Sequence, residues 1–332
     1  MSEKILICSL NWLGDCIMSM PAIQVLRNQE PEAHISVLVK PKLVDLWEMH
    51  SAVDDILVLE SGMAGALKAA DELKVITPHK AFIFPQSFRS ALVPALARVP
   101  KRRGQVGHNR SWMLTSVVKG VDEYSSRHQA WEYVDVLDLE VGIEGLPLPA
   151  LSVPEITDSG LLEVLDAEKG RTIIGLFPSA ARGPSKCWPM EHFIETAKML
   201  VKKDDCRVIV FGSPGEKERC DEIAGCIGDY AVSLAGKTSL KQLAGALKCC
   251  QAVLCNDSGG MHLAAAVGAG VVAVYGMTDP VKTGPWGKNH KIVQKYDVPK
   301  ARDIGRNVPE AIEILRSIKP KLAYDAIKDL LK

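Results

Sequence analysis

A repeated alternation of short apolar runs with longer helix-like stretches constrains the fold of this chain most strongly. The first half holds such runs at residues 5–8, 34–39, 55–59 and 80–84. The second half holds them at residues 172–177, 207–211, 231–234, 252–255 and 271–275. Runs of this length are typical of buried strands, and strands that alternate with helices form mainly parallel sheets covered by helices on both faces. We therefore predict an α/β protein built from doubly wound, Rossmann-like sheets.

A stretch rich in proline and glycine, between residues 142 and 160, separates the two series of strands. Its prolines at positions 147, 149 and 154 are typical of a linker. The total of 332 residues also exceeds what one hydrophobic core usually holds. We predict two domains, residues 1–155 and 156–315, that face each other across a cleft. Residues 316–332 hold an amphipathic helix that the pattern alone does not place.

The composition excludes several classes of protein. Lys plus Arg and Asp plus Glu both number 40, and this zero net charge argues against a general nucleic-acid binder. The nine cysteines form no CxxC pair, which excludes a zinc site or a secreted disulfide framework and fits reduced thiols in the cytoplasm. The first residues lack the architecture of a signal peptide. The longest apolar run, residues 263–277, is too short to span a bilayer, so we expect any membrane contact to be peripheral.

The stretch Asn-Asp-Ser-Gly-Gly-Met-His at residues 256–262 joins a predicted strand to an Ala- and Leu-rich run. Asp257 and Ser258 are residues that cap helix starts, and the two following glycines let a ligand approach the main chain. A helix start of this kind presents free N–H groups to a phosphate. A well-capped helix in any α/β protein would contain similar residues, so both interpretations remain open.

Two other loops of the second half carry charged residues after predicted strands. The segment 177–189 contains Arg182 and Lys186, and Lys186 could neutralise charge on a diphosphate leaving group. Glu216 follows the next strand and could accept two hydrogen bonds from a ribose diol. It could equally be a glutamate that the dipole favours at a helix start.

In the first half, Asp15 lies in a predicted loop after the first strand, with a helix expected from about Cys16. Its carboxylate could accept a proton from a substrate hydroxyl, or it could cap that helix. The loop at residues 86–90 follows the fourth strand, and the two loops should share a crevice because ligands gather at the carboxyl ends of parallel strands. The basic run at 101–103, with His108 and Arg110, is either a solvated loop or a contact for an acidic acceptor or anionic lipid.

Three familiar motifs are incomplete. Gly-Lys-Thr at 236–238 lacks the first glycine of a phosphate-binding P-loop, because Ala231 stands in its place. No G-x-G-x-x-G follows the first strand, which weakens a dinucleotide-dependent oxidoreductase. Ser258 lies where a hydrolase nucleophile would, but the elbow motif needs glycine at Asn256. A serine hydrolase and a non-catalytic nucleotide-binding module remain as rivals to a transferase.

Taken together, the segments resemble glycosyltransferase family 9, the ADP-heptose:lipopolysaccharide heptosyltransferases, and most closely its heptosyltransferase II branch. The matching motifs are NWLGD at 11–15, FPQSFRSALVPALARVP at 84–100, FPSAARGPSKCWP at 177–189, FGSPGEKE at 211–218, LAGKTSL at 234–240 and NDSGGMHLAAA at 256–266. The resemblance extends to about Pro285. Ala181, Arg182 and Gly260 depart from the family pattern.

The resemblance implies a GT-B fold and an inverting transfer that needs neither metal nor cofactor. The expected donor is ADP-heptose, and the expected acceptor is the heptose of the Kdo-lipid A inner core of lipopolysaccharide. We expect no nucleic-acid partner. We expect a cytoplasmic protein with peripheral contact to the inner membrane, on its cytoplasmic face.

The resemblance also implies roles for individual residues. Asp15 would be the general base and Lys186 the catalytic lysine at the donor phosphates. The donor-binding residues would be Ser179, Arg182, Glu216, Thr238, Asp257, Ser258, Gly259, Gly260 and His262. The acceptor-binding residues would be Asn11, Ser87, Arg89 and Arg103. Residues 316–332 would pack back onto the N-terminal domain.

Overall fold

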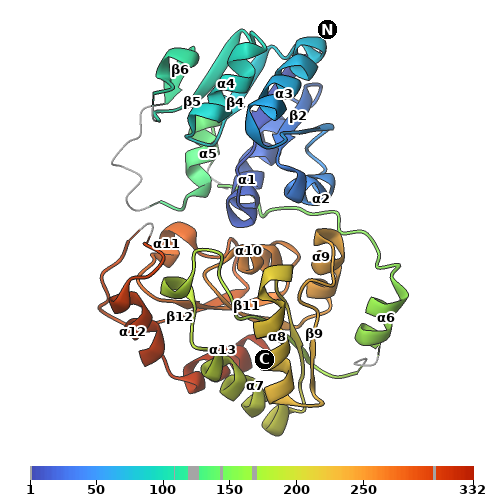
Figure 1. The fold of residues 1–332 in the computed structure, drawn as a ribbon, viewed down its shortest axis with the longest axis vertical. Coiled ribbons are helices and arrows are strands. Elements are labelled where there is room, and N and C mark those ends of the chain that lie inside the picture. The colour runs from blue at the N-terminus through green and yellow to red at the C-terminus, as the bar shows by residue number, and fades with distance from the viewer. Residues whose placement is uncertain (1, 108, 119–126, 143–144, 167–169, 302–303) are drawn as a thin grey trace. The chain divides into compact units, whose positions relative to one another are not determined.

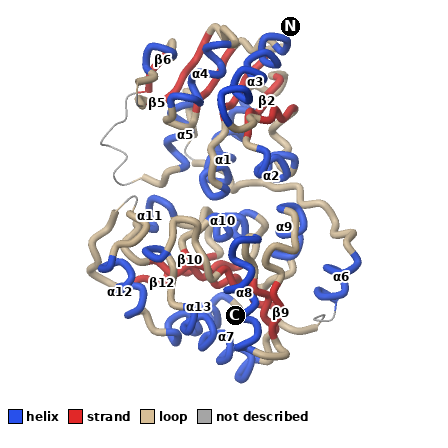
Figure 2. The backbone as a smooth tube through the Cα atoms, viewed as in Figure 1, coloured by secondary structure: helices blue, strands red, loops and turns tan. Residues whose placement is uncertain are grey.

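The computed structural model describes residues 2–107, 109–118, 127–142, 145–166, 170–301 and 304–332. The chain divides into two compact units, Met1–Ser152 and Val153–Lys332, each with its own parallel sheet (Figure 1). In each unit, helices cover both faces of the sheet (Figure 2). The predicted fold class, α/β with two doubly wound domains of the GT-B type, was confirmed.

The first unit holds a six-stranded sheet in the order β3-β2-β1-β4-β5-β6. Its strands are β1 (Lys4–Cys8), β2 (His34–Val39), β3 (Asp55–Val58), β4 (Lys80–Ile83), β5 (Lys101–Gln105) and β6 (Ser116–Val118). Its helices are α1 (Leu13–Gln29), η1 (Pro41–Leu43), α2 (Val44–Glu48), α3 (Gly62–Ile76), α4 (Phe88–Leu96), η2 (Ser111–Met113) and α5 (Ala130–Leu137). The central strand β1 is buried over its last four residues, as expected for a strand covered on both faces.

The second unit holds a six-stranded sheet in the order β12-β11-β10-β7-β8-β9. Its strands are β7 (Ile173–Phe177), β8 (Arg207–Val210), β9 (Ala231–Ser233), β10 (Ala252–Asn256), β11 (Gly270–Tyr275) and β12 (His290–Gln294). Its helices are α6 (Ser159–Asp166), η4 (Pro184–Lys186), α7 (Met190–Asp204), η5 (Pro214–Glu216), α8 (Lys217–Ile227), α9 (Leu240–Lys248), α10 (Gly259–Ala266), α11 (Pro280–Thr283), α12 (Pro309–Ser317) and α13 (Pro320–Leu330). All residues of β10 and β11 are buried, so the sheet forms the centre of this unit's core.

The two sheets follow the same route. In each, the chain runs outward from its first strand, then returns to the other side of that strand and continues outward in the opposite direction. This reversal lies between β1 and β4 in the first unit and between β7 and β10 in the second. Ligands of doubly wound sheets bind at the reversal, beyond the carboxyl ends of the strands. The loops after these four strands are therefore the places to look for a site.

Strands β5, β6 and β12 were missed by the sequence prediction. Strand β5 reads Lys-Arg-Arg-Gly-Gln, so the basic run, for which a solvated loop was one of our two interpretations, is a strand. Its arginine side chains are held by hydrogen bonds to main-chain carbonyls; Arg102 Nε, for example, lies 2.6 Å from the Met113 carbonyl oxygen. Because β5 is held by arginine hydrogen bonds and not by buried apolar side chains, its sequence has no apolar run from which a strand could be predicted.

Helix α1 begins at Leu13 rather than near Cys16, and it continues through Pro21. Asp15 therefore lies in the first helical turn and not in a loop. Trp12 occupies the N-cap position, so the alternative that Asp15 caps the helix was wrong. The acidic side chain near the helix start is favoured by the helix dipole.

The last helix, α13, belongs to the second unit. Ala323, Tyr324 and Ile327 are part of that unit's hydrophobic core. The Tyr324 hydroxyl lies 3.0 Å from Asp204 Oδ2 at the end of α7, and Lys328 pairs with the same carboxylate. The prediction that residues 316–332 return to the N-terminal domain was therefore wrong, because the apolar face of α13 is covered by α7 and the sheet of the second unit.

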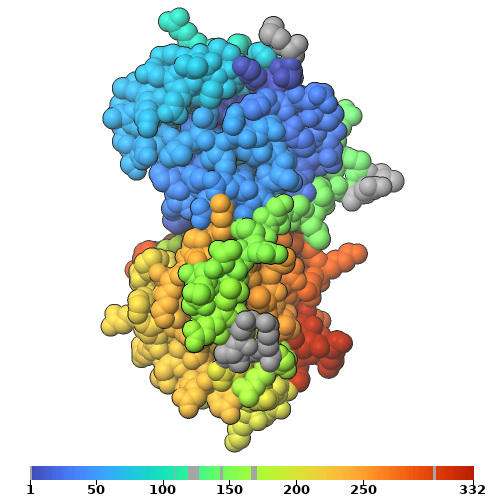
Figure 3. All heavy atoms as spheres, turned by 90° about the vertical axis from the view of Figure 1, so that its right-hand side faces the viewer, coloured from blue at the N-terminus to red at the C-terminus, as the bar shows by residue number. Residues whose placement is uncertain are grey.

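The segment that follows Ser152 is laid over the surface of the second unit (Figure 3). Its Ile156 packs against Gly245 of α9, where an added Cβ would lie only 2.8 Å from the Ile156 Cγ1 atom. Among the described residues, no helix is both long and apolar enough to cross a bilayer.

Candidate functional site

The predicted anion-binding helix start is present at the carboxyl end of β10. Strand β10 ends at Asn256, and α10 begins at Gly259 with Ser258 as its N-cap residue. The Ser258 side chain makes no capping hydrogen bond, which differs from our expectation. The first N–H groups of α10 are thus not occupied by this hydroxyl, and His262 lies in the same first turns, 5% exposed. Such a helix start favours a bound anion.

Gly260 is required by close packing. An added Cβ would lie 2.7 Å from Phe177 Cε1, well inside van der Waals contact. Phe177 ends β7, and its ring stacks on that of Phe211 at 5.4 Å between centroids. The bulky Phe177 therefore explains why glycine stands at position 260.

Lys186 and Asp257 form a nearly buried ion pair at the reversal between β7 and β10. The Lys186 Nζ atom lies 2.6 Å from Asp257 Oδ2, and the two side chains are 12% and 7% exposed. Lys186 ends η4 in the loop after β7, whereas Asp257 directly follows β10. Two residues that the sequence predicted for one site, 71 positions apart, are thus in contact.

Tyr275 lies next to Asp257, one member of this pair. It is fully buried at the end of β11, and its hydroxyl donates to the Thr283 carbonyl oxygen at 2.8 Å. Burial raises the pKa of Tyr275 well above its usual range, and the negative charge of Asp257 adds to the shift. Tyr275 therefore remains a neutral phenol beside the Asp257 carboxylate. It was not recognised from the sequence, since it reads there as an ordinary strand residue.

Trp188 anchors the loop that carries Lys186. Its main-chain N–H donates to Asn256 Oδ1 at 2.8 Å, and its indole Nε1 donates to the Ile318 carbonyl oxygen at 3.0 Å. The side chain is fully buried. Because Asn256 is the last residue of β10, this bond fixes the Lys186 loop directly to the strand that leads into α10.

Glu216 takes part in a capping box at the start of η5, the short helix that leads into α8. Its Oε2 atom accepts hydrogen bonds from the Ser213 main-chain N–H and hydroxyl, each at 2.7 Å. The Oε2 atom of Glu216 therefore has the role of a helix-start glutamate, which was the alternative interpretation. A ribose contact through the carboxylate remains a prediction.

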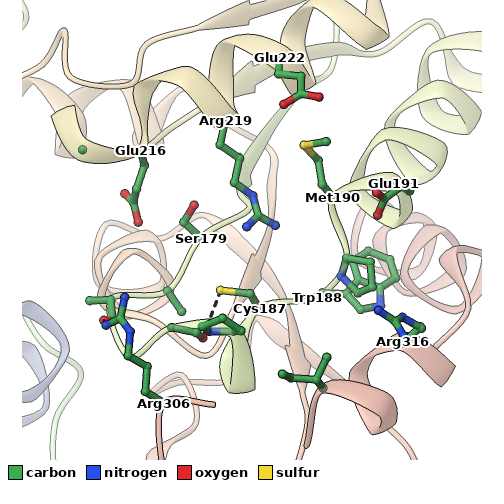
Figure 4. A pocket seen from close by; sticks show the side chains of 17 residues that line it. Ser179, Cys187, Trp188, Met190, Glu191, Glu216, Arg219, Glu222, Arg306 and Arg316 are labelled. Carbon is green, nitrogen blue, oxygen red and sulfur yellow. Dashed lines mark hydrogen bonds between the residues drawn. The ribbon is translucent and has the colours of Figure 1, made fainter. Parts of the chain in front are cut away.

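Ser179 and Glu216 line a pocket of about 690 Å³ in the second unit (Figure 4). The wall is completed by residues in or next to η4, α7, α8 and α12, among them Cys187, Met190, Arg219 and Arg306. In Figure 4 the Arg219 side chain extends between Ser179 and Met190. Sequence reasoning missed Arg219, although it follows Glu216 by three residues, a spacing that places two side chains on one helix face.

Arg306 was also missed, because nothing local in the sequence links it to the loop after β7. Its side chain covers Gly183, where an added Cβ would lie 2.6 Å from the Arg306 Cγ atom. Gly183 also has a φ of +95°, which an L-residue rarely adopts. The Arg306 carbonyl accepts from the Ser185 N–H at 3.2 Å. Arg306 thus holds the shape of the loop that leads to Lys186.

The remaining donor-site candidates lie on neighbouring loops. Thr238 is half-buried just before Ser239, whose hydroxyl caps α9 by accepting the Gln242 N–H at 3.2 Å. Arg182 is exposed on the loop after β7. The Lys237 ammonium donates to the Ser233 carbonyl oxygen at 2.9 Å. This lysine therefore bonds to the main chain just before its own loop, whereas the lysine of a P-loop binds phosphate.

The second candidate constellation lies in the first unit, around Asp15. The Gln129 side-chain amide donates to Asp15 Oδ1 at 3.3 Å and to the Tyr133 hydroxyl at 2.8 Å. Burial raises the pKa of Tyr133 well above its usual range, and the charge of Asp15 contributes next. Gln129 and Tyr133 come from the start of α5, and no sequence pattern indicated that they lie close to Asp15.

The four acceptor-site candidates differ in their surroundings. Asn11 is half-buried beside the start of α1. Ser87 is the N-cap residue of α4 and accepts the Ser90 N–H at 3.3 Å, while Arg89 donates to the Glu60 carbonyl oxygen. Arg103 pairs with Asp138 at 2.6 Å and donates to the carbonyl oxygens of Asp135 and Val136.

Arg103 therefore ties β5 to the end of α5, and its hydrogen-bonding capacity is largely used inside the fold. We no longer assign it to the acceptor. His108, part of the same basic region, lies outside the described residues. Within the described ranges, no three His, Cys, Asp or Glu side chains are grouped as metal ligands.

The profile of glycosyltransferase family 9 (heptosyltransferase) matches residues 80–311 of the chain, well over half of its 332 residues. The chain belongs to glycosyltransferase family 9. The family match spans Lys186, Asp257 and the pocket around Glu216, whereas Asp15 lies before its first residue.

Similarity to individual family members extends over most of the chain. Lipopolysaccharide heptosyltransferase 2 of Escherichia coli is 32% identical over 310 residues, which cover 88% of each chain. Lipooligosaccharide heptosyltransferase 2 of Haemophilus ducreyi is 31% identical over 317 residues, or 89% of each chain. The solved structure of E. coli ADP-heptose lps heptosyltransferase II superposes with a TM-score of 0.83 at 27% identity, covering 99% of this chain and 98% of that one. The chain is thus a family 9 glycosyltransferase that matches its relatives over most of its length.

Proposed function

We propose that this glycosyltransferase moves heptose from ADP-heptose onto the heptose of the lipopolysaccharide inner core, with inversion at the anomeric carbon and without a metal ion. The observation that carries the proposal is the Lys186–Asp257 pair, which lies beside the start of α10 at the reversal point of the second sheet. The names of the relatives supply the donor and the class of acceptor.

The donor's diphosphate would lie against the first turn of α10. The main-chain N–H groups of Gly259 and Gly260, with His262, would donate to its oxygens, since a helix start favours negative charge. Lys186 would supply the positive charge that a metal supplies in other transferases. As the bond to the sugar breaks, negative charge grows on the leaving phosphate, so a cation fixed beforehand stabilises the transition state more than the ground state.

The sugar's anomeric carbon would be attacked by an acceptor hydroxyl. The new bond joins that oxygen to the anomeric carbon, and the bond from this carbon to the phosphate oxygen breaks. The bonding electrons leave with ADP, and the hydroxyl proton passes to the Asp15 carboxylate. A single displacement of this kind inverts the anomeric configuration. Gln129 would hold the Asp15 carboxylate in position for this proton transfer.

The acceptor would carry negative charge from its phosphate and Kdo groups. Asn11, Ser87 and Arg89 lie at or just after the carboxyl ends of β1 and β4, on the same edge of the first sheet as Asp15. These three side chains remain our candidates for the acceptor. Since that acceptor is anchored in lipid, the enzyme would work on the cytoplasmic face of the inner membrane as a peripheral protein.

The test is incubation of the purified chain with ADP-heptose and a heptose-terminated acceptor, with release of ADP as the readout. We expect release that depends on the acceptor, survives a chelator and disappears in Asp15→Asn. The configuration of the new bond, read by NMR, should be opposite to that of the donor. Turnover with a different nucleotide sugar, and none with ADP-heptose, would redirect the proposal within family 9.

The same purified protein and its variants distinguish the transferase from two alternative functions, a serine hydrolase and a non-catalytic nucleotide-binding module. A hydrolase would lose esterase activity in Ser258→Ala, but Ser258 has φ −150° and ψ 169°, ordinary extended backbone rather than a strained nucleophile elbow. A non-catalytic module would bind ADP tightly and show no change in any readout on substitution of Asp15.

A further inference from the structure

The first unit contains a long segment without any acidic residue. From Leu73 to Val121 the sequence holds nine Lys or Arg and no Asp or Glu, although the whole chain has zero net charge. The segment includes β4, α4, β5, η2 and β6. Cations are thus concentrated in this segment, whose own residues include no carboxylate. Carboxylates of other segments pair with some of them, for example Glu3 and Glu30 with Lys80, and Asp138 with Arg103.

Large apolar side chains are exposed in the same segment. Trp112 is 73% exposed, Val106 53%, Phe88 43% and Leu96 36%. We call these four residues the Trp112 face. The rings of Phe88 and Trp112 lie 6.5 Å apart between centroids, so the start of α4 and η2 present their aromatic residues together. Phe88 and Leu96 are two helical turns apart on α4, which places them along one side of that helix.

The Trp112 face is held rigid from beneath by Arg110, which is fully buried. Its guanidinium donates to the Gln105 carbonyl oxygen at 2.7 Å, to the Ser90 hydroxyl at 3.2 Å and to the Pro85 carbonyl oxygen. These bonds join the loop before Trp112 to the residues around the start of α4. An exposed aromatic surface built on a fixed support loses little conformational entropy when it is covered.

Exposed cations border the Trp112 face. Arg98 and Lys101 lie at the end of α4 and the start of β5, and both are exposed. Arg102 and Arg103, in contrast, are half-buried and donate to main-chain carbonyls. Only part of the basic run is therefore directed to solvent, and it is the part next to Leu96.

We propose that the Trp112 face docks the enzyme on an anionic lipid bilayer. Trp and Phe rings are favoured at the level of lipid headgroups, and basic residues near them are attracted to anionic lipids. The face borders Ser87 and Arg89, so docking would bring the bilayer next to the edge of the sheet that bears Asp15. This choice of occupant rests on the proposed function, in which the acceptor is anchored in lipid.

The experiment is co-sedimentation of the full chain with vesicles of phosphatidylcholine alone and of phosphatidylcholine with phosphatidylglycerol. We expect binding that requires the anionic lipid. Trp112→Ser should weaken it about tenfold, and Arg98→Gln with Lys101→Gln should weaken it by about fivefold per cation removed. The matched control is Tyr296→Ser, which removes an aromatic residue that is 92% exposed on the second unit and should change nothing.

A second measurement guards against misfolding. Trp112→Ser should retain the wild-type unfolding midpoint, and it should retain wild-type turnover of a water-soluble acceptor while losing turnover of vesicle-bound acceptor. The proposal would be overturned if the wild type did not bind anionic vesicles, or if Trp112→Ser bound them equally well. It would also be overturned if inorganic phosphate abolished the binding. If the protein binds anionic vesicles but transfers no heptose, the docking proposal for the Trp112 face would stand and only the proposed function would be contradicted.

Discussion

The Lys186 ammonium lies 2.6 Å from the Asp257 carboxylate, and both side chains are almost wholly buried. The pair joins the loop after β7 to the start of α10. It places a cation at the helix start while the neighbouring carboxylate balances its charge before any ligand arrives. A diphosphate that binds there, as we propose, would compete with Asp257 for the same ammonium. We therefore expect the pair to act both as a structural link and as part of the proposed anion site.

The first prediction follows from this pair. Lys186→Met should lower the free energy of unfolding by about 3–5 kcal/mol, because it leaves a buried carboxylate without its partner. It should also lower kcat by roughly 10²–10³, because a cation at the leaving group is lost. Urea unfolding and ADP release measure the two effects. Lys202→Met, at an exposed position of α7, is the control. If Lys186→Met together with Asp257→Asn regains stability but not activity, the two roles are separate.

The second prediction concerns Gly260. Gly260→Ala should destabilise the protein by about 1–3 kcal/mol, because its Cβ meets the ring of Phe177. Thermal unfolding measures the loss. Phe177→Leu should be mildly destabilising alone and should restore stability when combined with Gly260→Ala. Additive losses in the double variant would show that the steric explanation is wrong.

The third prediction separates Gln129 from Asp15. Asp15→Asn should abolish turnover, whereas Gln129→Ala should lower kcat by roughly tenfold, since misplacing a base costs less than removing it. The KM for ADP-heptose should stay unchanged in Gln129→Ala, because Gln129 belongs to the unit assigned to the acceptor. Steady-state kinetics with each substrate varied in turn provides the measurement. A rise in the KM for the donor alone would contradict the assignment.

The fourth prediction is a pH dependence of stability. His50 is 2% exposed, its Nδ1 lies 3.1 Å from the Ala150 carbonyl oxygen, and burial lowers its pKa from 6.5 to about 4. Below pH 6.5 the unfolded chain binds a proton that the folded chain refuses until about pH 4. Stability should therefore fall through this window by about 1.4 kcal/mol per pH unit, or about 3 kcal/mol in all.

Urea unfolding between pH 7 and pH 4 tests this expectation. His50→Gln should remove that part of the slope, leaving only the contribution of other groups. His34→Gln, which replaces a histidine at the start of β2 whose side chain is 39% exposed and pairs with Asp55, serves as the control. Equal slopes in the wild type and in His50→Gln would show that His50 is not responsible.

The fold could be predicted where the strands are apolar and buried. Strands β1, β2, β7, β10 and β11 fit this description, and their alternation with helices indicated the sheet type. Strand β5 could not be predicted, because its arginines satisfy the chain by long-range hydrogen bonds rather than by apolar burial. Helix α13 was expected as an amphipathic helix, but which surface covers its apolar face depends on packing.

The candidate site shows the same division. Lys186 and Asp257 each stood out in a motif after a strand, and parallel topology brings such loops to one edge. Tyr275 and Trp188 support them through buried contacts, and the exposed Arg306 covers Gly183 in the loop that leads to Lys186. None of these contacts leaves a local signal in the sequence. Arg103 shows the opposite case, since a basic residue that stood out in the sequence pairs with Asp138 and donates to main-chain carbonyls of its own unit. Sequence patterns indicated which residues carry charge near the site, but not which of them are already occupied.

The placement of α13 also has a practical consequence. The second unit keeps its last helix and the segment after Ser152 against its own surface. A chain cut between Ser152 and Val153 would therefore leave each hydrophobic core with all of its elements. The two fragments could be produced separately and mixed. Recovery of transfer on mixing would make this enzyme a candidate for a split reporter, in which activity shows that two proteins fused to the fragments have bound each other.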